Sequence, residues 1–164
     1  MPMVIMRAAD LGVTGYETNS IVSNRALMQR IEKIRLEAGY RMGLGDVAEM
    51  VIPKVGIIAK PRHGGTIYSC YLTPHHAHAA HAVTGAICVA CCASIKETIA
   101  KTISKQTNDS SETVHIEHPS GVIDIDLQTS DSGSNTQVIS AGVIRTARKI
   151  MEGQVFVPER LWPK

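Results

Sequence analysis

The segment from Ala82 to Ala93 contains almost no polar side chain, and it constrains the fold more than any other part of the sequence. A helix formed here would have no polar face, and a helix that is apolar all round is buried all round. Its small side chains would let strands approach closely. The run is interrupted by Thr84 and is too short to cross a bilayer. The sequence therefore predicts a helix over 75–93 at the centre of a domain, surrounded by sheet.

Most of the remaining sequence indicates strands joined by turns. Alternating or β-branched stretches predict strands over 3–8, 47–60, 66–72, 114–117, 122–127, 138–146 and 154–157. An amphipathic helix is predicted over 25–41, with Ser23 or Asn24 as its cap, and a single helical turn over 147–152. Polar loops are expected at 12–23, 104–112 and 131–135. This pattern predicts an α+β fold with a mixed or antiparallel sheet.

The charge and the N-terminus exclude several functional classes. The 164 residues include 17 basic and 15 acidic side chains, which leave a net charge of +2. No run of Lys or Arg provides the basic surface typical of a nucleic-acid-binding protein. The first residues lack the regions of a signal peptide. We therefore expect a cytoplasmic protein without a nucleic-acid or membrane partner.

The cysteines favour a structural role. Cys88 and Cys91 have the spacing of half a zinc site, but there is no second pair of cysteines to complete it. Together with Cys92 they lie in the apolar segment, where thiols act as small hydrophobic groups. Metal binding or redox use is the alternative.

Four histidines precede the apolar helix: His75, His76, His78 and His81. Imidazoles are common metal ligands and proton carriers. Because the segment contains no Asp, Glu or Cys, we expect no metal. A polar rim that faces a ligand is the preferred interpretation, and simple surface or interface histidines are the alternative.

Two further features have the chemistry to hold an anion. Thr84-Gly85-Ala86 lies near the first turn of the predicted helix, where free backbone N–H groups attract a carboxylate or phosphate. The same small residues would also permit close packing. Arg145 and Arg148 could hold a carboxylate between them, although pairing with Glu152 or Glu159 is the more ordinary outcome. The sequence contains no P-loop and suggests no Ser-His-Asp arrangement.

Short motifs run in order along almost the whole chain. They are Arg7-Ala-Ala-Asp-Leu-Gly12, Thr14-Gly-Tyr-Glu17, Ile31-Glu-Lys-Ile-Arg35, Met42-Gly-Leu44, Pro74-His75 with His78, Ala82-Val-Thr-Gly-Ala-Ile87, His118-Pro-Ser-Gly121, Arg145-Thr-Ala-Arg-Lys-Ile-Met-Glu-Gly153 and Val157-Pro158. In this combination the chain resembles the PrpF family, which includes 2-methylaconitate and methylitaconate isomerases and 4-oxalomesaconate tautomerases. The resemblance implies a diaminopimelate epimerase-like fold, in which a sheet wraps around a central helix. Family members have two such domains with the active site between them. Residues 1–164 resemble only the C-terminal one and are expected to form a single domain.

The resemblance also implies a function. The family consists of cofactor-independent isomerases or tautomerases that move a proton, with a double-bond shift, in an unsaturated di- or tricarboxylate. The family's acid/base residues, a lysine and a cysteine of the N-terminal domain, have no counterpart here. Ala82 occupies the position at which related epimerases have a second catalytic cysteine. What carries over is a substrate-facing edge made of His75, His78, Val83, Thr84, Gly85 and Ala86.

Two interpretations follow from this partial resemblance. In the first, the chain holds a carboxylate of the substrate, and a missing N-terminal domain supplies the base. In the second, the chain is a truncated, catalytically inactive PrpF-like domain that acts as a homodimeric binding module, since a lone copy would expose apolar surface. Whether the chain is an enzyme by itself is open at this level.

Overall fold

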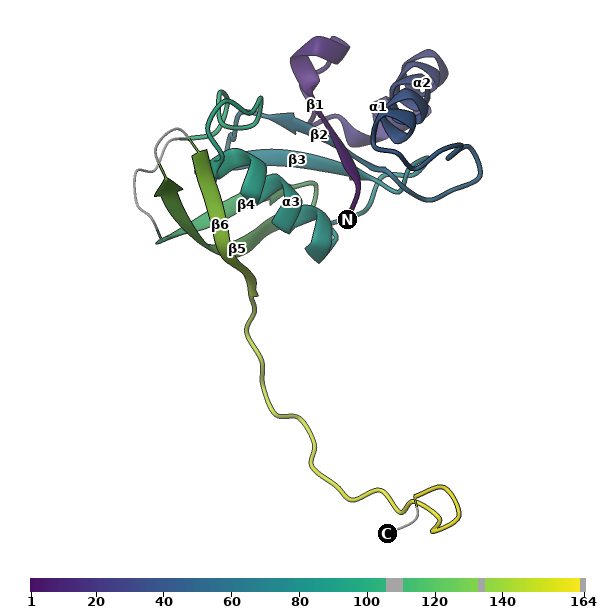
Figure 1. Cartoon of the computed structure of the whole chain (residues 1–164), viewed down its shortest axis with the longest axis vertical. Coiled ribbons are helices and arrows are strands. Elements are labelled where there is room, and N and C mark those ends of the chain that lie inside the picture. The colour runs from purple at the N-terminus through teal and green to yellow at the C-terminus, as the bar shows by residue number, and fades with distance from the viewer. Residues whose placement is uncertain (106–110, 133–134, 163–164) are drawn as a thin grey trace.

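The computed structural model of the chain describes residues 1–105, 111–132 and 135–162 (Figure 1). The elements in chain order are β1 (Met3–Arg7), a 3-10 helix (Ala8–Leu11), α1 (Thr18–Ser23), α2 (Arg25–Arg41), β2 (Lys54–Ala59), β3 (Ile67–Leu72), α3 (Val83–Ser94), β4 (Ser111–His118), β5 (Gly121–Ser132) and β6 (Asn135–Ile144).

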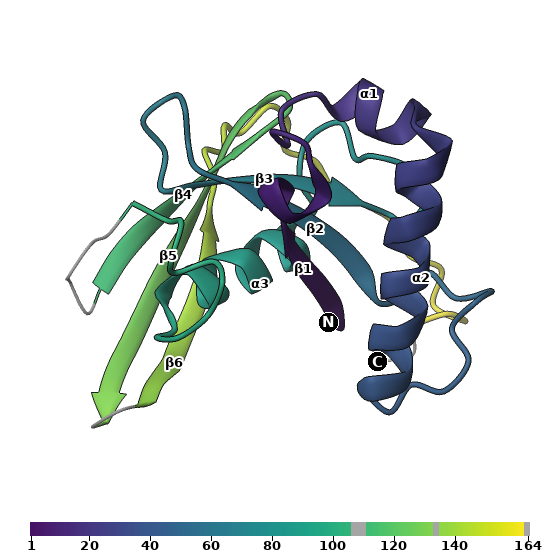
Figure 2. The same ribbon diagram turned by 90° about the horizontal axis from the view of Figure 1, so that it is seen from above.

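Six strands form one mixed sheet in the order β1-β2-β3-β4-β5-β6. Strands β1 and β2 pair in parallel, as do β3 and β4, and the other neighbours are antiparallel. Parallel neighbours need a crossover connection, which α1 and α2 provide for the first pair and α3 for the second. The sheet curves around α3 (Figure 2). The predicted α+β fold, with a mixed sheet around an apolar helix, is confirmed.

The sheet separates two apolar cores. Successive side chains of a strand point to opposite faces, so Ile58 packs in the core that contains α3, whereas Ile57 packs in the core beside α2. Ala86, Val89 and Ala90 of α3 are fully buried in the first core. The predicted central position of this helix is therefore confirmed.

The helix begins later than the sequence indicates. Residues 75–82 were expected to be helical, but α3 starts at Val83. The backbone N–H of His78 donates to the carbonyl of Tyr71 at 2.8 Å, and Leu72 forms an isolated β-bridge with Ala77. These contacts hold the segment against the end of β3, so it cannot adopt helical hydrogen bonding.

The expectation that α3 is covered on every side is wrong for one of its faces. The sheet curves around only part of the helix. The side chains on the remaining face are exposed or half-buried, and they are Val83, Thr84, Ile87, Cys88, Cys91 and Cys92. Burial still raises the pKa of the Cys91 and Cys92 thiols, in keeping with a structural role. Among the described residues no group of three or more His, Cys, Asp or Glu side chains could hold a metal ion. Within the same ranges no helix is both long and apolar enough to cross a membrane.

Helix α2 matches its predicted bounds, and Asn24 caps it by accepting a hydrogen bond from the backbone N–H of Leu27 at 3.1 Å. The strands predicted over 47–60 and 66–72 form the antiparallel hairpin β2–β3, and those predicted over 114–117 and 122–127 form the hairpin β4–β5. The loop expected over 12–23 contains the short helix α1. The loops expected at 104–112 and 131–135 lie partly outside the described residues.

The C-terminal tail, residues 145–162, differs most from the prediction. Strand β6 ends at Ile144, and residues 145–158 carry neither the helical turn expected over 147–152 nor the strand expected over 154–157. Figure 1 shows the tail running away from the sheet. The predicted strand is absent because this part of the chain meets no sheet edge with which to pair.

Candidate functional site

Three parts of the chain meet at the end of the sheet where α3 begins. The loop between β3 and α3 brings His78 and His81, His118 is the last residue of β4, and Arg145 directly follows β6. Their proximity is reflected in the pKa of His118. Burial and then the positive charge of Arg145 lower the pKa of His118, to which His78 also contributes. This end of the sheet therefore gathers basic groups from distant parts of the sequence.

The first turn of α3 offers backbone donors at the same place. Ala82 is the N-cap residue, and its side chain can provide no capping hydrogen bond. Val83 and Thr84 are exposed, and the Thr84 hydroxyl donates to the Met1 sulfur at 3.3 Å. The N–H groups of a first helical turn carry partial positive charge and favour a carboxylate.

Gly85 and Ala86 support this turn from below. Both are buried, and a Cβ atom added at Gly85 would lie 2.4 Å from Cε2 of the Tyr71 ring. The glycine thus allows the start of α3 to lie directly on β3. Of the sequence motif Thr84-Gly85-Ala86, only Thr84 has an exposed side chain. Gly85 and Ala86 are buried and allow the helix to pack closely on the sheet.

His81 is a buried, neutral support for the N-cap. Its Nδ1 lies 3.0 Å from the Ala82 carbonyl and its Nε2 lies 3.0 Å from the Ser69 hydroxyl. A bond to the carbonyl requires the proton on Nδ1, which leaves Nε2 to accept from Ser69. Burial is the main cause that lowers the pKa of His81 to about 4. The sequence grouped His81 with its three neighbours, and only its depth in the fold distinguishes it.

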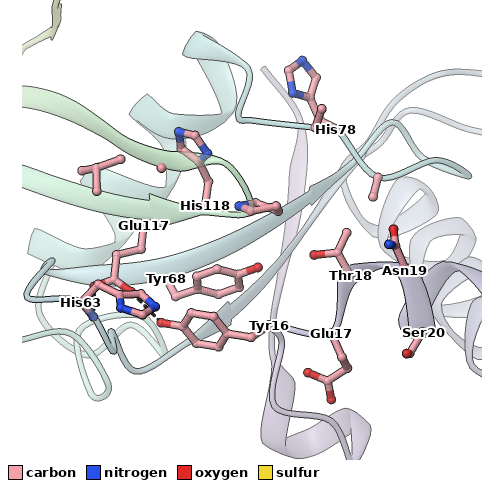
Figure 3. A pocket seen from close by; sticks show the side chains of 15 residues that line it. Tyr16, Glu17, Thr18, Asn19, Ser20, His63, Tyr68, His78, Glu117 and His118 are labelled. Carbon is pink, nitrogen blue, oxygen red and sulfur yellow. Dashed lines mark hydrogen bonds between the residues drawn. The ribbon is translucent and has the colours of Figure 1, made fainter.

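A pocket of about 800 Å³ adjoins this end of the sheet, between α1 and the β4–β5 turn (Figure 3). Its lining includes the predicted residue His78, whose Nδ1 accepts a hydrogen bond from the backbone N–H of Ala80 at 3.1 Å. The other side chains and backbone that line it come from Tyr16, Glu17, Thr18, Asn19, Ser20, His63, Tyr68, Ala77, Ala79, Glu117, His118, Pro119, Gly121 and Val122.

Glu117 forms part of the pocket wall but is fully engaged. Its carboxylate accepts hydrogen bonds from the Tyr16 hydroxyl at 2.7 Å and from the backbone N–H groups of Arg62, His63 and Gly65 at 2.9, 2.7 and 2.9 Å. Burial would raise the pKa of Glu117, but these donors together hold it at about 2. Such a weak base cannot accept a proton near neutral pH, so we assign Glu117 to fixing the β2–β3 turn.

Tyr16 is held in the same wall. Its ring stacks on Tyr68 with 3.8 Å between centroids, and the Arg62 guanidinium lies 4.3 Å from its other face. Burial and the hydrogen bond to Glu117 raise the pKa of Tyr16. Tyr16 therefore stays protonated and structural.

His75 lies apart from the other predicted site residues. Its exposed imidazole is 3.9 Å from the Glu32 carboxylate of α2. It borders a different hollow, formed by α2 and Pro74. The structure thus brings His78, Val83 and Thr84 together at one edge, places Gly85 and Ala86 beneath them, and leaves His75 outside. His118 and Arg145 complete the edge. The sequence indicates Arg145, together with Arg148, as a group with the chemistry to hold a carboxylate, but it does not single out His118.

This edge presents the N–H groups of the first turn of α3, the imidazoles of His78 and His118, and the guanidinium of Arg145. Among the described residues, neither a lysine nor a cysteine lines the pocket. Cys88 lies one helical turn after Thr84, with its thiol 3.7 Å from the Met1 carbonyl. The arrangement is suited to holding a carboxylate and is poorly equipped with a strong base.

The sequence model of the family described as PrpF protein matches residues 1–158. The chain is 43% identical over 159 residues to "Putative isomerase YbhH" of Escherichia coli K12, with 96% of this chain and 44% of that protein covered. It is 43% identical over 158 residues to "(4E)-oxalomesaconate Delta-isomerase" of Novosphingobium sp. KA1, with coverages of 96% and 43%. It is 30% identical over 176 residues to "3-methylitaconate isomerase" of Eubacterium barkeri, with coverages of 95% and 45%.

A solved structure supports the fold. The crystal structure of methylitaconate-delta-isomerase superimposes with a TM-score of 0.72 at 23% sequence identity, over 87% of this chain and 43% of that chain. This similarity confirms the expected architecture. In each of these comparisons, the chain spans less than half the length of the protein it matches.

Proposed function

The chain belongs to the PrpF family, and on that basis we propose that it is the carboxylate-holding part of an isomerase that shifts a double bond in an unsaturated di- or tricarboxylate. Relatives are named for the isomerisation of oxalomesaconate and methylitaconate, which are acids of this class. We propose the same class of substrate for this chain, and we assign to the chain the binding of a substrate carboxylate. We further propose that the chain corresponds to the C-terminal half of such an enzyme.

One observation carries the assignment: the uncapped start of α3 shares an edge with basic groups. His81 Nδ1 lies 3.0 Å from the carbonyl of the N-cap residue Ala82, and besides burial the charges of His118 and His78 lower the pKa of His81. The charge of Arg145 in turn lowers the pKa of His118, beside the effect of burial. A substrate carboxylate at this edge would accept hydrogen bonds from the N–H groups of Val83 and Thr84. Arg145 would balance its charge.

The same contacts would help the reaction itself. Removing a proton from carbon next to a conjugated double bond spreads negative charge onto the carboxylate oxygens. Donors already aimed at those oxygens stabilise that charge as it develops. The N–H groups of the first turn of α3 are fixed by the packing of Gly85 on Tyr71, so they need not reorganise.

The proton transfer requires a base, which we assign to a companion region. This name denotes the part of the relatives' length that the chain does not match, which is 56% of the E. coli protein. In this chain Glu117 is engaged by four donors and His81 is neutral and hydrogen-bonded on both nitrogens. A positioned acid or base typically contributes about 10²–10⁴-fold to the rate. A chain that holds the substrate without transferring a proton therefore binds it but accelerates the reaction little.

The test is binding of methylitaconate by the purified chain, followed by NMR of its backbone amides. We expect the largest shifts at Val83 and Thr84, and a dissociation constant about five- to tenfold weaker in Arg145→Ala. Arg148→Ala is the matched control, because Arg148 lies three residues farther along the tail and, unlike Arg145, is not among the groups that shift the pKa of His118. Equal affinity in all three proteins, or shifts elsewhere only, would contradict the assignment.

The second candidate is a catalytically inactive, homodimeric binding module. It is favoured by the open face of α3 and by β1 and β6, the outer strands of the sheet, each of which pairs with one neighbour within the described residues. Sedimentation of the purified chain distinguishes the two functions. A stable dimer that binds the acid, but gains no activity with the companion region, would favour this alternative.

A further inference from the structure

Two hydroxyl groups in the wall of the 800 Å³ pocket have no hydrogen-bond partner. Among the described residues, the Tyr68 hydroxyl oxygen and Thr18 Oγ1 are the side-chain atoms that are buried in this unpaired state. Tyr68 is 1% exposed, and the stacking of its ring on Tyr16 fixes its position. Buried polar groups are almost always hydrogen-bonded. An unpaired pair of hydroxyls in a pocket wall therefore points to a ligand that binds both.

The two hydroxyls approach each other from different elements and can both donate. In Figure 3 the Tyr68 hydroxyl of β3 and the Thr18 hydroxyl of α1 point toward one another. Burial raises the pKa of Tyr68, an effect that the Thr18 hydroxyl partly offsets. The phenol therefore keeps its proton at neutral pH, as the threonine hydroxyl does. Two O–H groups that face one place suit an oxygen atom that accepts hydrogen bonds.

The charges of the pocket wall favour an acceptor without charge. Glu117 has a pKa of about 2 and is ionised at neutral pH. Burial would raise the pKa of Glu17, but hydrogen bonds from the hydroxyl and the backbone N–H of Thr14 lower it. No lysine or arginine side chain of the described residues lines the pocket. An anionic group between Thr18 and Tyr68 would thus meet like charge without a counter-ion, whereas a carbonyl oxygen would not.

The pocket opens onto the proposed carboxylate site. His78 and His118 both line the pocket. Besides burial, the charges of these two histidines lower the pKa of His81, whose Nδ1 lies 3.0 Å from the carbonyl of Ala82, the N-cap residue of α3. A substrate held by one carboxylate at the start of α3 therefore has its remaining atoms beside this pocket.

We propose that Tyr68 and Thr18 determine substrate specificity by donating hydrogen bonds to an uncharged keto oxygen of an acid whose carboxylate lies at the start of α3. The substrate class of the proposed function is thereby narrowed to keto acids. A site built to hydrogen-bond one substrate oxygen discriminates against the analogue that lacks it, because its own buried groups then stay unpaired. This inference rests on the proposed function for the position of the carboxylate.

The experiment measures binding of 2-oxoglutarate and of glutarate, two acids that differ only in the keto oxygen, by titration calorimetry of the full chain. Tyr68→Phe and Thr18→Val each remove one hydroxyl with little change of shape, and Tyr40→Phe is the matched control at an exposed position of α2. We expect the parent and the control to prefer 2-oxoglutarate about tenfold. Each pocket variant should bind 2-oxoglutarate about fivefold more weakly and glutarate as before. An equal affinity of the parent for the two acids, or an unchanged preference in Tyr68→Phe, would overturn the proposal.

Thermal denaturation tests the unpaired state of the hydroxyl without any ligand. A buried hydroxyl that lacks a partner destabilises the fold, so Tyr68→Phe should melt no lower than the parent. A melting temperature lowered by several degrees would show that the hydroxyl is bonded within the fold, and it would overturn the proposal. Loss of the keto preference in the pocket variants, together with unchanged binding by Arg145→Ala, would support the specificity pair and contradict the proposed carboxylate site alone. A parent that binds neither acid would contradict both.

Discussion

A Cβ atom at position 85 would lie 2.4 Å from Cε2 of Tyr71, so the first turn of α3 rests directly on the ring of a β3 residue. The aromatic ring is itself buried and cannot move away freely. The absence of a side chain at Gly85 thus sets how closely the start of α3 lies to β3, and with it the position of the N–H groups of Val83 and Thr84.

Gly85→Ala should therefore destabilise the protein, although alanine normally favours a helix by about 1 kcal/mol over glycine. We expect the free energy of unfolding to fall by about 1–3 kcal/mol because of overpacking. Gly142→Ala is the control, since nothing lies within 4 Å of a Cβ added there. Urea denaturation of both variants checks this, and a Gly85→Ala protein as stable as the control would disprove the packing role.

Glu117 should contribute stability that depends on pH. Its pKa is about 2 in the folded protein against an ordinary value of 4.5, so the folded state favours the ionised form. The contribution is complete above about pH 4.5 and is lost as the pH falls toward 2. Glu117→Gln should cost about 2 kcal/mol at neutral pH, because a charged acceptor of four hydrogen bonds is replaced.

The measurement is denaturation of Glu117→Gln and of the exposed-site control Asp126→Asn across this range. The Glu117 variant should lose less stability on acidification than the parent, whereas the Asp126→Asn control should lose as much as the parent. A variant whose acid sensitivity equals that of the parent would argue against the assigned role.

His81 should give the stability of the fold a second dependence on pH. Its pKa is about 4 in the folded protein and 6.5 ordinarily, so the unfolded chain binds the proton more readily. Stability should fall as the pH decreases from about 6.5 to 4. In His81→Gln this part of the pH dependence should disappear, while the exposed-site control His76→Gln should retain it. NMR titration of the His81 ring offers a direct reading, and protonation near pH 6.5 would refute the buried, neutral assignment.

Local signals were sufficient for much of the fold. The spacing of Leu27 and Ile31, together with the Asn24 cap, defines α2, and small apolar residues such as Ala90 indicate the buried side of α3. These features depend on neighbours within a few residues. Such features can therefore be predicted from short stretches of sequence.

Features that depend on distant partners were not predictable in the same way. Residues 75–82 look helical, but a hydrogen bond from His78 to Tyr71 keeps them off the helix. The strand expected over 154–157 has suitable side chains and lacks an edge. Glu117 is recognised only through its bonds to a turn more than fifty residues earlier in the chain.

The candidate site follows the same division. The Thr84 region could be identified as a helix start, whereas the approach of His118 and Arg145 depends on how β4, β5 and β6 pair. His75 shows that neighbours in the sequence can separate in space. It belongs to the histidine cluster of the sequence, but the loop turns its imidazole toward Glu32.

The central claim is that this chain holds the substrate while the companion region moves the proton. The most direct test is NMR of proton exchange into methylitaconate and oxalomesaconate in D₂O, with the chain alone and then with the companion region added. We expect no exchange above the uncatalysed rate for the chain alone, and exchange once the companion region is present. Exchange by the chain alone that disappears in His78→Ala or His118→Ala would contradict the claim, because it would make an imidazole of this chain the base.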